Sequence, residues 1–158
     1  MPGRNSSALF EKLRKSIIEK YADGDILDIG CGYNKIRGAY GVDLYSCDAD
    51  YVGFLNDLEL KENSFDVVVL SATLNYIDND RINEILSECY RVCRDELIIT
   101  CITPLGGLLH RFFRKDQPTG MSPKYIIKLV ERYGFKLSLS HSFMCFLNRI
   151  YIFEKRFL

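Results

Sequence analysis

The sequence predicts an α/β fold, a doubly wound and mostly parallel sheet of seven strands with an antiparallel C-terminal edge hairpin and helices on both faces. Short apolar runs of strand type alternate with segments of helical periodicity, which is the pattern of right-handed crossovers between parallel strands. The last two strand-like runs have no helix between them, so we expect them to pair as the hairpin. At 158 residues the chain fits one domain, spanning residues 1–158.

The first part of the chain carries one helix and three short strands. Ser7–Tyr21, within the N-terminal segment 1–22, has apolar residues at three- and four-residue spacing and predicts an amphipathic helix. The apolar run Ile26–Ile29 leads into glycines and predicts a buried strand that ends in a tight turn. Two weaker strands follow, at residues 41–44 and 51–55.

The middle of the chain carries the most convincing strand. Phe65–Leu70 is rich in β-branched residues, and we expect it at the centre of the sheet. Asp80–Val92 has helical spacing behind a capping acid or amide, and Leu97–Ile102 is the next buried strand.

The last part begins with residues 104–120, which we expect to be irregular. A helix is predicted at Ser122–Tyr133, because a proline is tolerated in its first turn and a glycine follows it. The hairpin then pairs Phe135–Ser140 with Ile150–Phe153 and leaves one antiparallel strand at the edge. A sheet of this kind binds ligands in the crevice outside the carboxyl ends of its parallel strands.

Composition and charge exclude some classes of protein. Lysine and arginine number 21, as do aspartate and glutamate, so no basic surface for nucleic acid is expected and nucleic acid is an unlikely partner. No apolar run approaches the roughly 18 residues that span a membrane, so we expect a soluble protein with no membrane span. Six cysteines form no CxxC pair and no secretory pattern opens the chain, which favours free thiols, no metal site and a reducing, cytoplasmic location.

The strongest motif is the segment Ile26-Leu27-Asp28-Ile29-Gly30-Cys31-Gly32-Tyr33-Asn34. Glycines after a buried strand let the backbone approach a ligand closely, but two glycines alone fit any nucleotide loop. The acid two residues before the first glycine is the discriminating feature. Only about one helical turn, Lys35–Ala39, fits before the second strand.

With Asp28-x-Gly30-x-Gly32 and further motifs in the same order, the chain resembles the class I (Rossmann-like) S-adenosylmethionine-dependent methyltransferases. The resemblance implies S-adenosylmethionine as cofactor and S-adenosylhomocysteine as product. It implies that Asp28 orders the loop and meets the amino-acid end of the cofactor, while the backbone of 30–32 lies against it. We therefore expect Gly30→Val to abolish cofactor binding by filling the space that the ligand needs. Asn34 stands where a third glycine is common, and asparagine tolerates a left-handed backbone.

Later positions continue the resemblance. Asp43 ends the second strand, where the family has an acid that accepts both ribose hydroxyls. Asp57 matches an acidic position near the adenine, or serves as an ordinary turn acid. In the turn that faces the transferred methyl, Asn75-Tyr76 replaces Glu-His. The predicted cofactor-binding residues are Asp28, Gly30, Cys31, Gly32, Asn34, Asp43, Leu44, Asp57, Leu58, Ser71 and Asn75.

Methyl transfer from a sulfonium requires few functional groups from the protein. Displacement at a sulfonium methyl mainly needs alignment in a dry pocket, and a base is needed only if the acceptor must lose a proton. Tyr76 and His110 are the catalytic candidates, although Tyr76 also fits a pocket wall and His110 a surface residue. Residues 104–121 are a candidate lid or substrate insertion, or alternatively a dimer surface or an element packed on the domain edge.

The predicted function is methyl transfer to a small or medium-sized acceptor. The absence of an Asn-Pro-Pro-Tyr-type motif after the fourth strand disfavours DNA adenine. The alternative is a non-catalytic cofactor-binding or scaffold protein on the same fold, which the missing Glu-His favours. A nicotinamide-dependent oxidoreductase is disfavoured, because Gly30-x-Gly32-x-x-Lys35 lacks the third glycine that packs helix and strand around a pyrophosphate.

Overall fold

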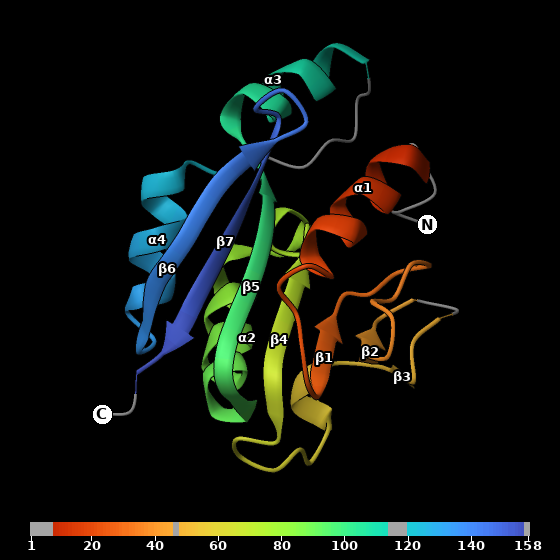
Figure 1. Ribbon diagram of the computed structural model, residues 1–158, viewed down its shortest axis with the longest axis vertical. Coiled ribbons are helices and arrows are strands. Elements are labelled where there is room, and N and C mark those ends of the chain that lie inside the picture. The colour runs from red at the N-terminus through yellow and green to blue at the C-terminus, as the bar shows by residue number, and fades with distance from the viewer. Residues whose placement is uncertain (1–7, 46–47, 114–119, 157–158) are drawn as a thin grey trace.

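The protein is a seven-stranded sheet flanked by helices, seen in a computed structural model that describes residues 8–45, 48–113 and 120–156 (Figure 1). For residues 8, 79 and 110–113 the description covers the backbone alone. The strand order is β3-β2-β1-β4-β5-β7-β6. The strands are β1 Ile26–Ile29, β2 Tyr40–Asp43, β3 Tyr51–Val52, β4 Phe65–Ser71, β5 Cys93–Ile102, β6 Phe135–Phe143 and β7 Asn148–Lys155.

The pairing of the strands confirms the predicted fold class. Strands β3, β2, β1, β4 and β5 pair in parallel, and β6 and β7 form the predicted antiparallel hairpin. One detail differs: β7 lies between β5 and β6, so the antiparallel strand is one position inside the edge. The last helix connects β5 to β6, and β6 is parallel to β5 but not adjacent to it. β7 lies between the two and is antiparallel to both. The chain runs outward from β1 to β3 and then resumes at β4, so the point where the strand order reverses lies between β1 and β4.

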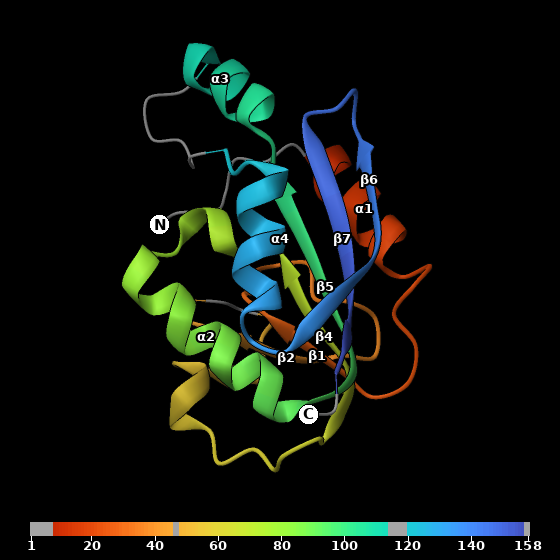
Figure 2. The ribbon, with the colours of Figure 1, turned by 90° about the vertical axis from the view of Figure 1, so that its left-hand side faces the viewer.

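Helices cover both faces of the sheet and one end of it (Figures 1 and 2). α1 packs on one face, and α2 and α4 on the other. α3 lies beyond the end of the sheet toward which β4 and β5 point (Figure 1). The bounds are α1 Ala8–Ile18, α2 Asn79–Val92, α3 Pro104–Phe113 and α4 Pro123–Glu131, with short 3-10 helices η1 Leu55–Asp57 and η2 Leu74–Tyr76.

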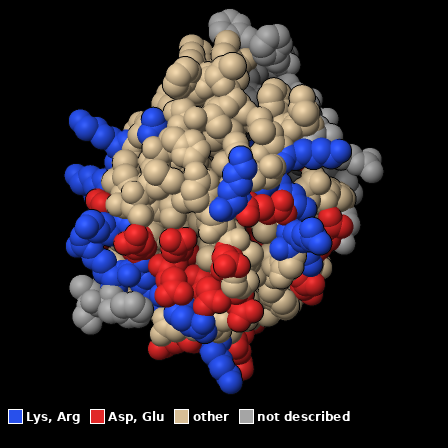
Figure 3. Space-filling view, viewed as in Figure 1, with Lys and Arg blue, Asp and Glu red and all other residues tan. Residues whose placement is uncertain are grey.

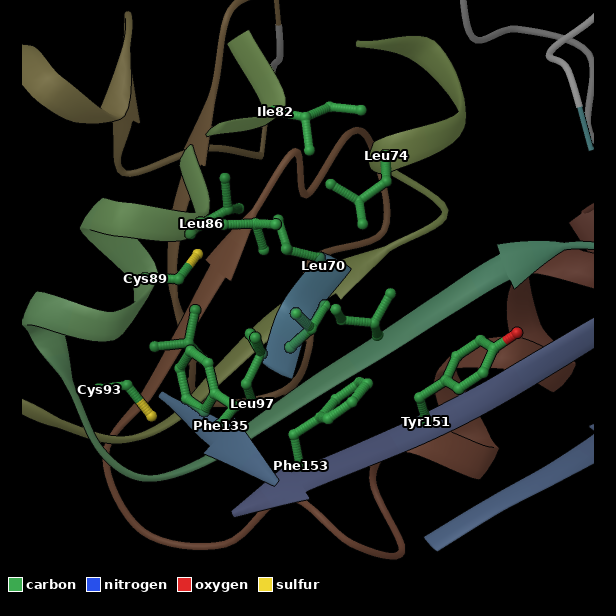
Figure 4. Packing of buried hydrophobic residues seen from close by; sticks show 14 of the residues in the cluster. Leu70, Leu74, Ile82, Leu86, Cys89, Cys93, Leu97, Phe135, Tyr151 and Phe153 are labelled. Carbon is green, nitrogen blue, oxygen red and sulfur yellow. The ribbon is translucent and has the colours of Figure 1, made fainter. Parts of the chain in front are cut away.

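Two apolar clusters hold these layers together. The larger lies between the sheet and the helices α2 and α4, and Figure 4 shows Leu86 and Cys89 of α2 facing Leu97, Phe135 and Phe153 of the sheet. The smaller lies on the opposite face, where Ile18 of α1 is fully buried against β-strand residues. Burying these side chains is the main driving force for the fold. Within the described part of the chain, no helix is long and apolar enough to cross a membrane.

Several boundaries differ from the sequence prediction. Residues 104–113 form α3, although we predicted 104–120 to be irregular; residues 114–119 lie outside the described part. Strand β3 has two residues, and the rest of the predicted strand 51–55 runs into η1. Strand β5 begins at Cys93 because its polar first residues pair with the start of β4. Lys35–Ala39 contain turns rather than the expected helical turn.

Candidate functional site

Asp28 is a buried acid at the centre of the sheet. Its side chain belongs to a residue that is 1% exposed, and its Oδ2 accepts a hydrogen bond of 2.8 Å from the Ile36 N–H. The other oxygen, Oδ1, is buried and has no hydrogen-bond partner among the described residues. Burial raises the pKa of Asp28 to about 6, and the Ile36 N–H and the charge of Lys15 act in the opposite direction. Asp28 thus binds Ile36 at the far end of the glycine-rich loop, and its Oδ1 is a hydrogen-bond acceptor without a described partner.

Asp43 lies on the other side of the same loop. Its Oδ2 accepts a hydrogen bond of 3.0 Å from the Gly32 N–H, and its Oδ1 accepts one of 2.8 Å from the Tyr45 N–H. The Gly30 N–H donates to the Val42 carbonyl at 2.7 Å, which holds the loop against the end of β2. The structure therefore brings Asp28, the two glycines and Asp43 together, and a carboxylate with two backbone donors keeps further acceptor capacity.

The two glycines serve different purposes. Both have a left-handed backbone, with φ of +72° at Gly30 and +57° at Gly32. A Cβ at Gly30 would lie 2.6 Å from Thr73 Cγ2, whereas a Cβ at Gly32 would meet no atom within 4 Å. The expectation that a side chain at Gly30 would fill ligand space is therefore wrong, because its first atom would strike Thr73. The open space lies above Gly32.

The loop that follows β4 is tied to its neighbours at three points. The Ala72 N–H donates to both the carbonyl and Oγ1 of Thr100, each at 3.0 Å. Thr73 Oγ1 donates to the Ile29 carbonyl at 2.8 Å, which joins this loop to the glycine-rich loop. Asn75 Oδ1 accepts from the Ile102 N–H at 3.0 Å, so this oxygen is committed to β5. Ala72 has φ of +57°, a strained conformation for a non-glycine residue of the kind that clusters at functional sites.

Helix α1 covers the site from the side. The Asn34 side-chain amide donates to the carboxylate of Glu11, and the Arg37 N–H donates to Glu19 Oε1 at 3.2 Å. Asn34 has no positive φ, so the left-handed conformation that asparagine tolerates is not used at this position, and the side chain binds α1. We did not foresee these contacts. The signal was the placement of Glu11 seven residues, about two helical turns, before the apolar Ile18, which puts both residues on the inner face of the helix.

A second contact that we did not foresee braces β2. Asp50 Oδ2 accepts hydrogen bonds of 2.7 Å from both the Gly41 N–H and Lys35 Nζ. A Cβ at Gly41 would lie 2.5 Å from Lys35 Cδ and 2.9 Å from Cys31 Sγ, so only glycine lets these side chains cross β2. Burial raises the pKa of the Cys31 thiol to about 12, which keeps it neutral.

The remaining predicted residues lie at varied distances from this group. Ser71 ends β4, two residues past the position that pairs with Asp28. Leu44 is exposed just after Asp43, and Leu58 packs against the larger apolar cluster. Asp57 is exposed in η1, and no hydrogen bond connects its carboxylate to another described residue. Its place in the cofactor site therefore stays a prediction.

The structure describes the side chain of one of the two catalytic candidates, Tyr76. Tyr76 is 64% exposed at the end of η2, directly after the loop that follows β4. His110 belongs to α3, and its side chain lies outside the described part of the chain. Among the described residues, no group of three or more histidine, cysteine, aspartate or glutamate side chains could hold a metal ion.

A glycine-rich loop at the point where strand order reverses, with acids on both sides, defines a Rossmann-like nucleotide-binding protein. Residues 27–100 match a family model described as a methyltransferase domain. This match and the folds of the solved structures below agree with the predicted resemblance to the class I S-adenosylmethionine-dependent methyltransferases. No curated protein sequence matches the chain.

Solved structures share the fold at low sequence identity. A SAM-dependent methyltransferase from Methanosarcina mazei is 19% identical, with 90% of this chain and 98% of that chain covered and a TM-score of 0.69. One from Archaeoglobus fulgidus is 17% identical, with coverages of 92% and 94% and a TM-score of 0.74. Magnesium protoporphyrin IX methyltransferase from Synechocystis PCC 6803, solved with bound SAH, is 14% identical, with coverages of 97% and 90% and a TM-score of 0.69.

Proposed function

We propose that this chain binds S-adenosylmethionine at the ends of β1 and β2 and transfers the methyl group to a small or medium-sized acceptor. The observation that carries the proposal is the joint placement of Asp28, Gly32 and Asp43 around one loop. The residues fit the cofactor: Asp28 Oδ1 is a buried acceptor with no described partner, suited to an ammonium group, and the space above Gly32 is open. Asp43 is suited to ribose hydroxyls through its remaining acceptor capacity.

Bound S-adenosylmethionine supplies a methyl group on a sulfonium, which is already a good leaving group. The protein's own task is to position the acceptor in line and to exclude water. Ala72 and Thr73 donate hydrogen bonds and Asn75 accepts one, and these bonds fix the loop after β4 to the strands on either side, which suits a loop that positions an acceptor. We propose Tyr76 as a wall of the acceptor site or as the proton acceptor where one is needed.

A non-catalytic cofactor-binding protein is the second candidate. It is favoured by Asn75, because the amide oxygen that stands in place of the family's Glu-His pair already accepts a backbone hydrogen bond. The amide of Asn75 therefore cannot serve as the base that a Glu-His pair could supply. Both candidates predict cofactor binding, and only turnover separates them.

We propose that the protein acts in the cytoplasm on a small molecule. The free cysteines support a reducing compartment: Cys31, Cys89, Cys93 and Cys101 are buried and Cys145 is exposed, while Cys47 lies outside the described residues. Equal numbers of acidic and basic residues give no general attraction for nucleic acid.

The cofactor site is tested by calorimetric titration of S-adenosylhomocysteine into the wild type and Asp43→Ala. We expect Asp43→Ala to weaken binding by about 1–3 kcal/mol, because it removes acceptors for the ligand and the anchor of Gly32. The matched control is Asp95→Ala, an exposed acid at the start of β5, at the opposite end of the sheet, which should bind like the wild type. Equal affinity of all three proteins would refute the site.

Turnover of S-adenosylmethionine with a panel of phenol, amine, thiol and carboxylate acceptors separates the two candidates. We expect one acceptor class to yield S-adenosylhomocysteine above the rate without acceptor, and Asp43→Ala to reduce that yield. A wild type that binds the cofactor and turns over no acceptor would favour the binding protein.

A further inference from the structure

Arg14 lies on the face of α1 that covers the glycine-rich loop. Positions three and four apart share one face of a helix, so Glu11, Arg14 and Ile18 point in related directions. Glu11 accepts a hydrogen bond from Asn34 of the loop, and Ile18 is fully buried against the sheet. Arg14, between them, is partly buried, and it interacts electrostatically with Tyr76, at the end of the turn after β4.

The guanidinium of Arg14 is desolvated without being neutralised. Among the described residues it makes neither a hydrogen bond nor an ion pair, and the side chains that interact with it electrostatically are Glu11, which carries a charge, and Tyr76. Burial lowers its pKa from the ordinary arginine value. The other basic side chains of α1 differ, since Lys12 is exposed and Lys15 lies 3.9 Å from Glu19. A guanidinium removed from water with no partner is costly unless an anion reaches it.

A second unpaired group lies beside the same loop, with the opposite charge. Asp28 Oδ1 is buried without a described partner, and Lys15, the neighbour of Arg14 on α1, acts on the charge of Asp28. The site therefore offers an unused carboxylate oxygen from the sheet and an unused guanidinium from the covering helix. A ligand that carries both an ammonium and a carboxylate would satisfy the two together.

We propose that Arg14 is a carboxylate-binding residue of this site and that α1 contacts the ligand through it. The proposal rests on the proposed function. Two molecules could bring the carboxylate: the cofactor, through its amino-acid end, or the acceptor, because Tyr76 beside Arg14 lies in the turn after β4. The planar guanidinium matches a carboxylate through two parallel hydrogen bonds, which a lysine cannot reproduce.

The test compares Arg14→Gln and Arg14→Lys with the wild type and with Lys12→Gln, which removes a charge from the exposed side of the same helix. The first probe is S-adenosylhomocysteine, and the second is its decarboxylated analogue, 5′-deoxy-5′-(3-aminopropylthio)adenosine. The third is benzoate, titrated into protein saturated with S-adenosylhomocysteine. Thermal midpoints verify that the variants remain folded.

If the cofactor brings the carboxylate, Arg14→Gln weakens S-adenosylhomocysteine binding about 10- to 100-fold and leaves the decarboxylated analogue unchanged. Arg14→Lys then falls between the wild type and Arg14→Gln. If the acceptor brings it, both adenosyl probes bind unchanged and benzoate binding is lost. Either pattern supports the proposal.

The proposal is overturned if Arg14→Gln binds all three probes like the wild type, or if it loses both adenosyl probes equally, which a structural role of α1 would produce. These outcomes leave the proposed function intact. A wild type that fails to bind S-adenosylhomocysteine would instead refute the proposed function.

Discussion

At the scale of single residues, Asp28 lies in a buried position where desolvation disfavours the charged form of its carboxyl group. The folded-state pKa of about 6 lies above the unfolded value near 3.8, so the folded protein binds the proton more tightly. The contribution of Asp28 to the stability of the ligand-free protein therefore falls as pH rises from about 4 to about 6 and levels off above that. An acid that destabilises the empty protein at neutral pH is what a cation-binding role would retain.

We predict that Asp28→Asn stabilises the ligand-free protein relative to the wild type more at about pH 7.5 than at about pH 4.5. The change in this difference should be about 2 kcal/mol, because a pKa raised from 3.8 to about 6 corresponds to roughly 3 kcal/mol in full and about a third of that is already lost at pH 4.5. Urea denaturation at the two pH values measures it, and comparing the two proteins cancels the other titrating groups. A pH-independent difference would contradict the raised pKa. The same variant should bind S-adenosylhomocysteine more weakly.

The two glycines of the loop give a paired prediction. Gly30→Ala should lower the thermal midpoint strongly, because its Cβ would strike Thr73 in a left-handed conformation. Gly32→Ala meets open space, so it should cost only about 1 kcal/mol of backbone strain while its methyl group reduces S-adenosylhomocysteine affinity. Calorimetric titration and thermal melts of both variants separate the effects. Similar stability losses in the two variants would contradict the different surroundings of the two glycines.

At the scale of elements, the last strand is clamped to the end of α2. Lys155 Nζ of β7 donates to the carbonyls of Tyr90 and Cys93 at 2.6 and 2.7 Å and to Asn63 Oδ1 at 2.7 Å. It also lies 4.4 Å from the centroid of the Tyr90 ring. A cation that binds the last carbonyls of a helix satisfies them and complements the helix dipole.

We predict that Lys155→Met lowers the free energy of unfolding by about 2 kcal/mol, because the helix-end carbonyls lose a charged donor. The affinity for S-adenosylhomocysteine should not change, since the clamp lies at the opposite end of the sheet from the glycine-rich loop. Lys136→Met, on the exposed part of β6, is the matched control and should stay within about 0.5 kcal/mol of the wild type. An unchanged free energy of unfolding in Lys155→Met would show that water satisfies the carbonyls that Lys155 binds.

Elements with strong periodicity could be predicted from the sequence, and those shaped by contacts could not. The run of β-branched residues in β4 and the spacing in α2 carry their own signal. Helix α3 was missed because Gly106 and Gly107 lower helix propensity, yet a Cβ at Gly106 would lie 2.3 Å from the Leu147 carbonyl. The glycine permits packing, which sequence spacing does not reveal.

The same distinction applies to the candidate site. Its centre, Asp28 to Gly32 with Asp43, follows from a local pattern of strand, glycines and strand end. Its periphery depends on contacts between distant segments: Thr73 with Ile29, and α1 with the loop. Asp57 was selected by order along the chain alone, and its carboxylate makes no hydrogen bond to another described residue.

At the scale of the whole molecule, the end of the sheet that holds the candidate site also carries an apolar surface. Figure 3 shows few charged side chains over α3 and the adjoining ends of β6 and β7, while acidic side chains gather lower on the same face. Leu105 and Leu108 of α3 are exposed, and Phe146, at the tip of the hairpin, is 71% exposed. The turn that presents Phe146 has three successive non-glycine residues with positive φ, 144–146, and Thr103 Oγ1 donates to the Phe146 carbonyl at 2.8 Å. Strain that Thr103, the residue before α3, holds in place indicates a surface with a use beyond folding.

The candidate lid over the site therefore consists of α3 together with this hairpin turn. We predict that Leu105→Ser with Leu108→Ser leaves the thermal midpoint and S-adenosylhomocysteine affinity close to wild type, because both side chains are already exposed. Turnover of apolar acceptors should fall severalfold, mostly through a higher KM, since apolar contact with the acceptor is lost. Leu9→Ser, exposed on the neighbouring α1, is the comparison. If the double variant loses cofactor affinity as well, α3 supports the site structurally and is not a lid for the acceptor.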